Sequence, residues 1–222
     1  MKNSLGYPDD NVLLFFKFSE KQWIQKLVDG ELSFSCIDSF IKQAISSGND
    51  IQGDPYEGVF AHLRIDNVLV EEMRTKLGSD LEEIPDGDFL YLRRYSAKTK
   101  PIFCIYAHKN LDASANVASP TSGWKTVVFR FDSKMYSGFV PNSKTNTFTG
   151  VLLKSDVFHE NVINALNAYK PSLSYNIKHV RYQDITGADF FIEPTDDYPE
   201  LFIKSTKYVY QNESRICISN IK

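Results

Sequence analysis

Hydrophobic and polar positions recur along this chain with the periods of both strands and helices. Val12 to Phe18, VLLFFKF, is a run of apolar residues that predicts a strand, and Lys17 is its one charged member. Similar runs predict strands over 31–35, 89–95, 102–107, 124–132, 147–154 and 174–182. Apolar residues at helical spacing predict helices over 38–44, 67–77 and 155–168, and one that begins at the Ser19 capping box and ends at Asp29-Gly30.

Polar and turn-forming residues predict the connections between these elements. Residues 1–10 read as a polar leader, and 46–58 as a loop with three glycines, one proline and several acids. An acidic connection is predicted over 80–88, and a polar loop over 111–123. Strands and helices do not alternate regularly, so the sequence predicts one α+β domain over 11–222, with mixed or antiparallel sheets and flanking helices.

The segment from Lys207 to Ser219, KYVYQNESRICIS, is predicted to be a strand with an unusually polar middle. Because strand side chains alternate between faces, Gln211, Glu213 and Arg215 are expected on one face. This pattern favours a strand that presents a carboxylate to a cleft. The alternative is that Glu213 and Arg215 pair with each other or with a neighbouring strand.

Composition narrows the class of protein. The 222 residues are 42% hydrophobic and 24% charged, which is typical of a globular protein with a core. The net charge of −3 disfavours a protein built mainly to hold nucleic-acid phosphates. Three cysteines without CxxC spacing predict reduced thiols in a cytoplasmic protein. No signal peptide and no apolar run near the about 18 residues of a membrane span are present, so no membrane partner is expected.

Several common catalytic motifs are absent from the sequence. It contains no GxxxxGK[ST] phosphate loop, no GxGxxG after a strand, no GxSxG elbow and no HExxH. Cys104 and His108 are four residues apart at the end of a predicted strand, where a metal pair is not favoured. No metal site is therefore predicted.

Motifs at both ends of the chain resemble a family of uncharacterised bacterial and phage-borne proteins. LLFFKF is similar to the family's Tyr-Lys-Tyr-like opening strand, and ELSFS to its Leu-Tyr-Phe-Ser-Ser strand. Gly53-Asp54-Pro55-Tyr56-Glu57 resembles an Asn-Asp-Pro-Phe-Glu-like loop. Lys204 and Gln211-Asn212-Glu213-Ser214-Arg215 resemble a Glu-x-Glu-x-Arg-like closing strand. The resemblance implies a setting in phage–host conflict or phage defence.

The same order of motifs resembles, more distantly, the ADP-ribosyltransferase fold. That resemblance implies NAD as the cofactor, with Lys17 near its phosphate or ribose and Ser33 and Ser35 ordering the pocket. It implies Glu213 as the catalytic carboxylate and Gln211 as the amide that positions it. Tyr56 and Arg215 are further candidate cofactor-binding residues. Two positions depart from the transferase pattern, since a Lys replaces the usual Arg or His and Phe34 lies between the serines.

Three functions follow as hypotheses. The first is an enzyme that handles NAD or another small-molecule nucleotide, as an ADP-ribosyltransferase or NAD glycohydrolase, with a protein or nucleic acid as the acceptor. The second is a non-catalytic module that binds nucleic acid or protein. The third is a metal-dependent nuclease that uses Asp54, Glu57 and Glu213.

Overall fold

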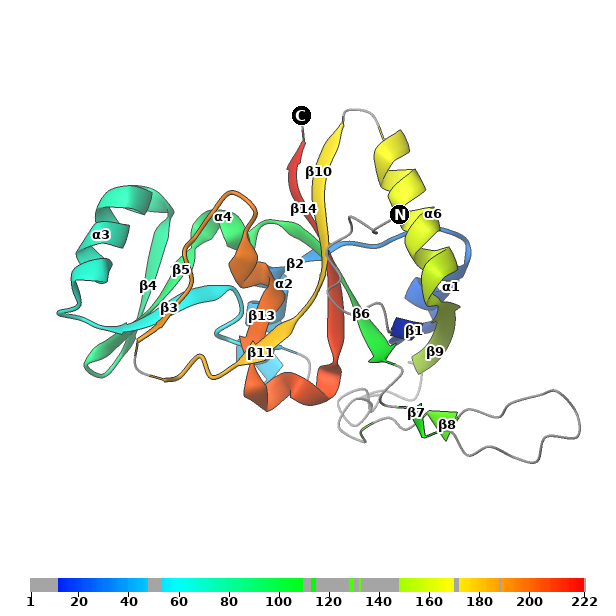
Figure 1. The fold of residues 1–222 in the computed structure, drawn as a ribbon, viewed down its shortest axis with the longest axis horizontal. Coiled ribbons are helices and arrows are strands. Elements are labelled where there is room, and N and C mark those ends of the chain that lie inside the picture. Colours follow the sequence, from blue (N-terminus) through cyan, green and yellow to red (C-terminus); the bar gives the residue numbers. More distant parts are fainter. Residues whose placement is uncertain are drawn as a thin grey trace, which may run out of the picture.

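The computed structural model describes residues 12–47, 53–109, 113–114, 128–129, 132, 148–169, 172–187 and 189–221. A larger and a smaller β-sheet lie side by side, and helices pack on both (Figure 1). Helices and mainly antiparallel sheets confirm the predicted α+β class. The predicted leader over 1–10 lies outside the described residues, as do most of 111–123 and 124–132.

The larger sheet has the strand order β10-β14-β6-β1-β9, and a short strand, β2, also pairs with β6. All of these pairs are antiparallel. The strands are β1 (Val12–Glu20), β2 (Ser35–Cys36), β6 (Pro101–Lys109), β9 (Phe148–Lys154), β10 (Leu173–His179) and β14 (Glu213–Ile221). The last strand of the sequence, β14, therefore lies inside the sheet between β10 and β6.

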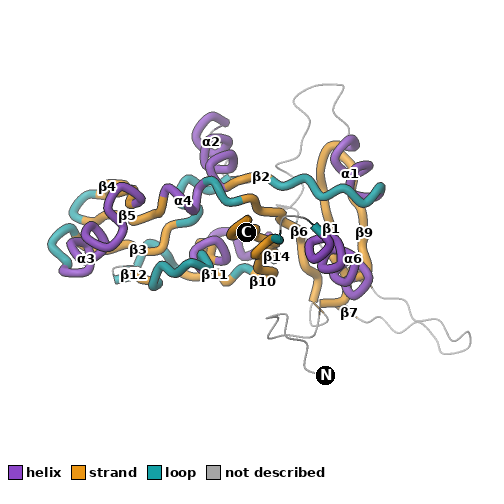
Figure 2. Tube along the Cα trace, turned by 90° about the horizontal axis from the view of Figure 1, so that it is seen from above, coloured by secondary structure: helices purple, strands orange, loops and turns teal. Residues whose placement is uncertain are grey.

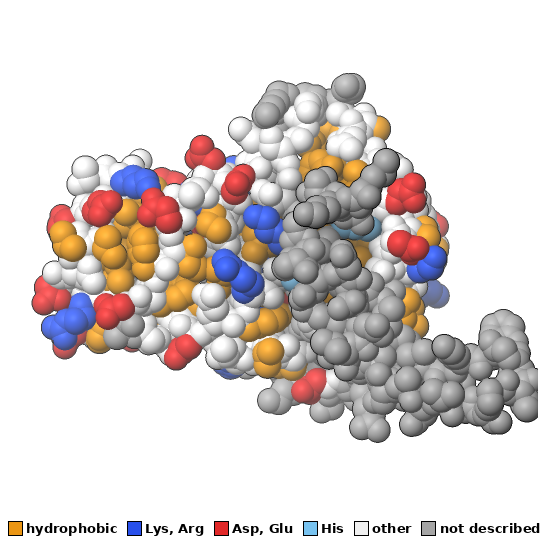
Figure 3. Space-filling view, in the orientation of Figure 1, with side chains coloured by type: hydrophobic (Ala, Val, Ile, Leu, Met, Phe, Trp, Pro, Cys, Tyr) orange, Lys and Arg blue, Asp and Glu red, His pale blue; other side chains and the backbone are white. Residues whose placement is uncertain are grey.

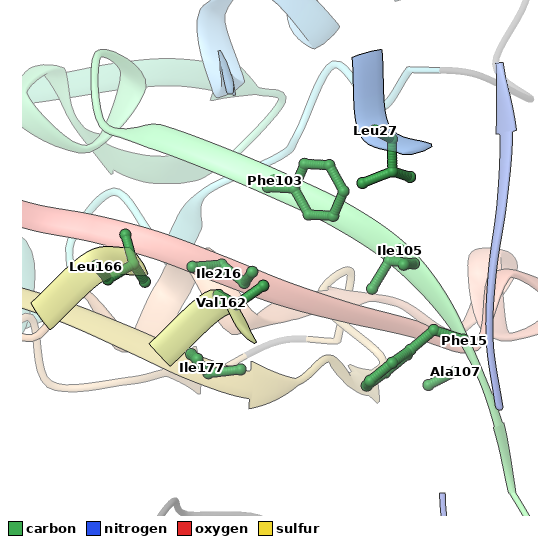
Figure 4. Packing of buried hydrophobic residues seen from close by; sticks show 9 residues of the cluster. All are labelled: Phe15, Leu27, Phe103, Ile105, Ala107, Val162, Leu166, Ile177 and Ile216. Carbon is green, nitrogen blue, oxygen red and sulfur yellow. The ribbon is translucent and has the colours of Figure 1, made fainter. Parts of the chain in front are cut away.

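One face of the larger sheet is covered by α1 (Lys21–Val28) and α6 (Ser155–Ala168). Leu27 of α1 and Val162 and Leu166 of α6 pack on apolar side chains of the strands. Figure 4 shows this core, which also contains Phe15, Phe103, Ile105, Ala107, Ile177 and Ile216. Because strand residues alternate, Glu213, Arg215 and Cys217 of β14 point to the opposite face.

The opposite face carries a second core. Ile37 and Ile41 of α2 (Ile37–Ser47) pack there with Ile102 of β6 and Cys217 of β14. Further contacts come from α4 (Tyr95–Lys98) and from the 3-10 helix η3 (Pro199–Phe202). This layer encloses the polar residues of β14.

The smaller sheet has the order β12-β3-β5-β4 and lies at the other end of the molecule from β1 and β9 (Figure 2). Its strands are β3 (Val59–Arg64), β4 (Leu81–Asp86), β5 (Phe89–Arg94) and β12 (Phe190–Phe191). Val70 and Met73 of α3 (Val68–Leu77) pack on it, and the Asn67 side chain accepts the Leu69 N–H to cap that helix.

The remaining elements are short. They are the 3-10 helix η1 (Gly78–Asp80), the pair β7 (Ala113–Ser114) and β8 (Val128–Phe129), the parallel pair β11 (Arg181–Gln183) and β13 (Ile203–Ser205), and the 3-10 helix η4 (Thr206–Gln211). No helix in the described part of the chain is long and apolar enough to cross a membrane.

Four local predictions are wrong. The acidic connection over 80–88 is largely strand β4, and the strand over 31–35 shortens to β2. Ser19 belongs to β1, so the helix begins after Glu20, and no side chain caps it. The closing strand begins only at Glu213, because η4 precedes it and Asn212 adopts a left-handed backbone with φ 37°.

Candidate functional site

The larger sheet divides beside Lys17. Strand β1 pairs with β6 on one side and with β9 on the other. The pairing with β6 ends at the Phe16–Tyr106 pair, whereas the pairing with β9 continues to Glu20. On the same edge of β6, β2 pairs only with Ile102 and Pro101. Figure 4 shows β1 and β6 close together at Phe15 and Ala107 and apart near Phe103. Across this gap the Lys17 ammonium donates a hydrogen bond of 2.6 Å to the Cys104 carbonyl.

A cavity of about 320 Å³ lies at this division. Small-molecule sites commonly measure roughly 300–1,000 Å³, so the cavity is of ligand size. Its walls include aromatic residues from separate elements, namely Phe16 and Phe18, Phe40, Tyr106 and Tyr210. Its charged and amide-bearing walls are Lys17, Gln43, Glu57, Lys204, Gln211, Glu213 and Arg215.

Arg215 organises the charged wall of the cavity. Its side chain is 1% exposed, and its Nε donates to Glu213 Oε1 at 2.5 Å. Its Nη1 donates to the Leu201 carbonyl at 2.5 Å, and its Nη2 donates to Glu57 Oε1. Glu57 and Arg215 are 158 positions apart in the sequence. One guanidinium therefore fixes two buried carboxylates from distant parts of the chain.

Lys204 of β13 completes this cluster. Its Nζ donates to Glu213 Oε2 at 2.8 Å and to Gln211 Oε1 at 2.6 Å, and it lies 3.8 Å from Glu57 Oε2. Burial alone lowers the pKa of Lys204, but Glu213 and Glu57 outweigh burial and raise it above the ordinary value. Lys204 is thus a permanent cation that aligns the amide and the carboxylate.

Glu213 is held as a carboxylate. Burial raises its pKa, but the charges of Arg215 and Lys204 outweigh burial and hold the pKa well below the usual range. Its backbone N–H donates to the Tyr182 hydroxyl at 2.8 Å, so the residue is fixed at both ends. Arg215, Lys204 and the Cys104 side chain bond to this carboxylate, which has about four acceptor positions, so about one remains for a ligand hydroxyl.

Lys17 differs from the other two cations. No carboxylate in the described part of the chain lies within ion-pair distance of its Nζ, which is 5.1 Å from the centroid of the Phe103 ring. Burial lowers its pKa, although Cys104 and Glu213 oppose this shift. When Lys17 is protonated, three cations face the carboxylates of Glu57 and Glu213, and the wall carries a surplus of positive charge.

The molecular surface over the smaller sheet shows no such bias. In Figure 3, acidic and basic side chains are interspersed around apolar ones on the visible face of β3, β4, β5 and α3. Mixed charges of this kind produce no strong field of one sign. The buried surplus at the cavity is therefore a local property of the site.

The structure brings together four of the residues predicted from sequence. Lys17, Gln211, Glu213 and Arg215 all line the cavity. Glu213 and Arg215 share a strand face and form an ion pair, as the alternative interpretation proposed. The prediction that Gln211 lies on that same strand is wrong, since it ends η4. Gln211 and Glu213 are instead connected by Lys204, whose Nζ donates to both side chains.

The other three predicted residues do not line the cavity. Ser33 is an exposed residue in an irregular segment, and Ser35 pairs with Ile102 at the edge of β6. The Tyr56 side chain is 36% exposed, with its ring 4.4 Å from that of Tyr91. The cavity and the serine motif border the same strand edge without sharing side chains.

Two residues of the charged wall were not predicted for the NAD site, although Glu57 belongs to the nuclease alternative. Glu57 reads as a solvated loop acid, yet it is 2% exposed. Its turn is held by Arg93, whose Nη1 donates to the Pro55 and Glu57 carbonyls at 3.1 Å. Lys204 lies in the short apolar stretch LFIKS. A lysine in such a stretch is the sequence signal for a buried cation with a charged partner.

The carboxylates do not fit the divalent-metal alternative. Glu57 and Glu213 each bond to Arg215, so a guanidinium lies where a shared cation would be required. In the described residues, no three His, Cys, Asp or Glu side chains form a group that could hold a metal ion. The arrangement favours an anionic ligand over a cation.

Comparisons with protein-family models, curated proteins and solved structures found no match to this sequence.

Proposed function

We propose that this chain handles NAD or a related nucleotide in the cavity between β1 and β6, as an enzyme of ADP-ribosyltransferase-like type. The observation that carries the proposal is the convergence of Lys17, Glu57, Lys204, Gln211 and Glu213 around one cavity. These residues come from separate motifs along the chain. A purely structural ion cluster does not require a cavity of ligand size beside it.

The chemistry of the walls suits the parts of a nucleotide. The surplus positive charge at Lys17 favours a phosphate group, and the aromatic walls suit a planar ring. The volume of about 320 Å³ suits the nicotinamide mononucleotide half of NAD, which includes one phosphate, with the rest of the dinucleotide extending outside.

The proposed reaction is cleavage of the bond between nicotinamide and ribose. The bond breaks with its electron pair leaving on nicotinamide, and the ribose carbon gains positive charge before water or another acceptor attacks it. Glu213 accepts a hydrogen bond from a ribose hydroxyl and stabilises this charge. Arg215, Lys204 and Gln211 hold the carboxylate in place.

Turnover of NAD tests the catalytic part. We expect nicotinamide release by the purified protein and a loss of at least about 100-fold in Glu213→Gln, since removing an electrostatic stabiliser costs about 10²–10³ in rate. Glu200→Gln is the matched control, because Glu200 is also buried and pairs with Arg94, and neither residue lines the cavity. Equal losses in both variants would assign the effect to folding.

Binding separates an enzyme from a non-catalytic module. An NAD-dependent rise in melting temperature without nicotinamide release would support the binding module. The absence of both NAD turnover and an NAD-dependent thermal shift would refute the proposal.

A pair of lysines tests the anion site. Lys17 donates to the Cys104 carbonyl, and Lys100 likewise donates to the Ser219 carbonyl at 2.8 Å and lies 4.6 Å from the centroid of the Tyr198 ring. Lys17→Met is expected to weaken ADP-ribose binding by about tenfold or more, as expected for loss of a charged contact. Lys100→Met is expected to leave the affinity unchanged. Equal affinities of both variants for ADP-ribose would contradict the role of Lys17.

A further inference from the structure

Asp54 is a buried carboxyl group that acts on the charged wall of the cavity. The proposed reaction does not use it. Its side chain is 3% exposed, and Oδ1 accepts the Tyr56 N–H at 2.9 Å in a turn. Its Oδ2 is buried without a hydrogen-bond partner in the described residues. Burying an ionised oxygen without a donor is unfavourable, so this environment favours the protonated carboxyl.

The groups around Asp54 connect it to the charged wall. Glu57 follows in the same turn and repels a charge on Asp54, whereas Lys204 of β13 and Arg215 of β14 attract it. Arg93 of β5 bonds to the carbonyls of this turn. Two phenols are also near this turn: the charge of Asp54 acts on Tyr91 of β5, and the Tyr208 hydroxyl of η4 donates to the Gly53 carbonyl at 3.3 Å.

We propose that Asp54 is a positioning residue that sets the charge of the cavity through Glu57, Lys204 and Arg215, so that its protonation strengthens anion binding. With Asp54 neutral and Lys17 protonated, the wall has three cations and two carboxylates. Ionised Asp54 adds a third carboxylate and cancels the surplus. The cavity then attracts a phosphate less strongly.

The direction of titration agrees with this arrangement. Burial, followed by repulsion from Glu57, raises the pKa of Asp54 to about 6. The switch therefore lies between about pH 5 and pH 7.5. Lys17 acts in the same direction, because burial lowers its pKa and acid protonates it. Only the part of the pH dependence that disappears in an Asp54 variant belongs to Asp54.

The test is calorimetric binding of ADP-ribose and of inorganic pyrophosphate at pH 5, 6, 7 and 7.5. ADP-ribose is a suitable probe, since its pyrophosphate stays ionised over this range. The wild-type affinity for ADP-ribose is expected to fall by about tenfold from pH 5 to 7.5, as expected for one charge several ångströms from the ligand. Asp54→Asn, which retains the Oδ1 acceptor, is expected to keep most of the low-pH affinity at pH 7.5.

Asp184→Asn is the matched control. Asp184 Oδ1 accepts the Thr186 N–H at 3.0 Å in a similar turn, but the residue is exposed and does not line the cavity. This variant is expected to follow the wild-type pH profile. A wild-type profile in Asp54→Asn, or loss of binding at pH 5 in folded Asp54→Asn, would overturn the inference.

The inference rests on anion binding in the cavity of the proposed function, and the two can fail separately. Pyrophosphate itself loses a proton in this pH range, so its binding is compared between wild type and Asp54→Asn at each pH. A difference between the two profiles, without ADP-ribose binding, would preserve the role of Asp54 and refute a nucleotide ligand. ADP-ribose binding with an unchanged profile in Asp54→Asn would preserve the nucleotide and refute the role of Asp54. Absence of binding by both probes at pH 5 would refute both.

Discussion

Among the described residues, the Arg94–Glu200 pair and the Arg215 cluster have all of their charged partners buried, and they differ in what surrounds them. Arg94 donates to Glu200 Oε1 and to the Thr195 carbonyl, and its guanidinium lies 4.2 Å from the centroid of the Tyr198 ring. It therefore has one carboxylate and an aromatic cover. Arg215 has two carboxylates, and a cavity lies beside it.

The difference shows why a buried ion pair alone is weak evidence for function. Arg94 and Glu200 pair one charge of each sign within the fold, although Glu200 Oε2 is buried without a hydrogen-bond partner in the described residues. The Arg215 cluster adds Lys204 and the nearby Lys17, and it faces space of ligand size. The cavity and the surplus charge, rather than the ion pair, point to a ligand.

The largest expected effect comes from removing each arginine. Arg215→Met is expected to destabilise the protein by about 5 kcal/mol or more, because it leaves two buried carboxylates without this partner. Arg94→Met leaves one such carboxylate, so a loss of about 3 kcal/mol is expected. Urea unfolding followed by circular dichroism measures both. Equal losses would remove the proposed distinction between the clusters.

A control separates charge from packing. Adding Glu57→Gln and Glu213→Gln to Arg215→Met removes the stranded charges and should recover part of the stability. No recovery would mean that packing of the arginine side chain dominates.

The next effect concerns pH and Asp54. A folded-state pKa of about 6, against an ordinary 3.8, means that Asp54 contributes stability in full below about pH 4 and loses it as the pH rises through 6. The stability of the wild type relative to Asp54→Asn is therefore expected to fall by about 3 kcal/mol from pH 4 to 7.5. Denaturant unfolding across this pH range measures the difference.

Asp184 provides the comparison for this profile. Its bonds to Thr186 lower its pKa, so its contribution to stability is present above about pH 4 and lost only in stronger acid. The difference between wild type and Asp184→Asn should therefore stay nearly constant from about pH 4 to 7.5. A stability difference between wild type and Asp54→Asn that does not change with pH would show that burial does not raise the pKa of Asp54.

A smaller effect concerns the turn that holds Asp54 and Glu57. A Cβ on Gly53 would lie 2.4 Å from the Phe40 carbonyl oxygen and 2.8 Å from the Ala44 Cβ, so Gly53→Ala must displace the turn from α2. We expect a destabilisation of about 2–3 kcal/mol, together with weaker ADP-ribose binding. Thermal melting and calorimetry measure the two effects.

Gly87 of the smaller sheet serves as the control. It has φ +60° and open space around it, so Gly87→Ala meets only backbone strain, with a cost of about 1 kcal/mol. Its ADP-ribose affinity should not change. A Gly53→Ala variant with wild-type affinity would separate the position of this turn from ligand binding.

Local patterns predicted the buried strands and the longer helices, because their side chains repeat with the period of the element. They failed for β4, LEEIPD, which lies at an edge of the smaller sheet and keeps polar side chains towards solvent. They also failed for η4, since the aromatic alternation in KYVYQ resembles a strand. The left-handed Asn212 that separates η4 from β14 has no strong local signature.

The site was only partly predictable for a different reason. Lys17, Glu213 and Arg215 attract attention as charges inside apolar strands. The roles of Glu57 and Lys204 depend on contacts with β14 that join distant parts of the chain, and no local pattern encodes such contacts. The burial of Asp54 likewise arises from tertiary packing.

The position of β14 inside the larger sheet has a consequence for biosynthesis. Until residues 213–221 leave the ribosome, β6 and β10 lack the strand that separates them, and each exposes an edge able to pair with other chains. Arg215 belongs to this strand, so Glu57 cannot form its ion pair with Arg215 until β14 has been translated. A nascent chain that stalls before β14 should therefore lack the site and be prone to aggregation.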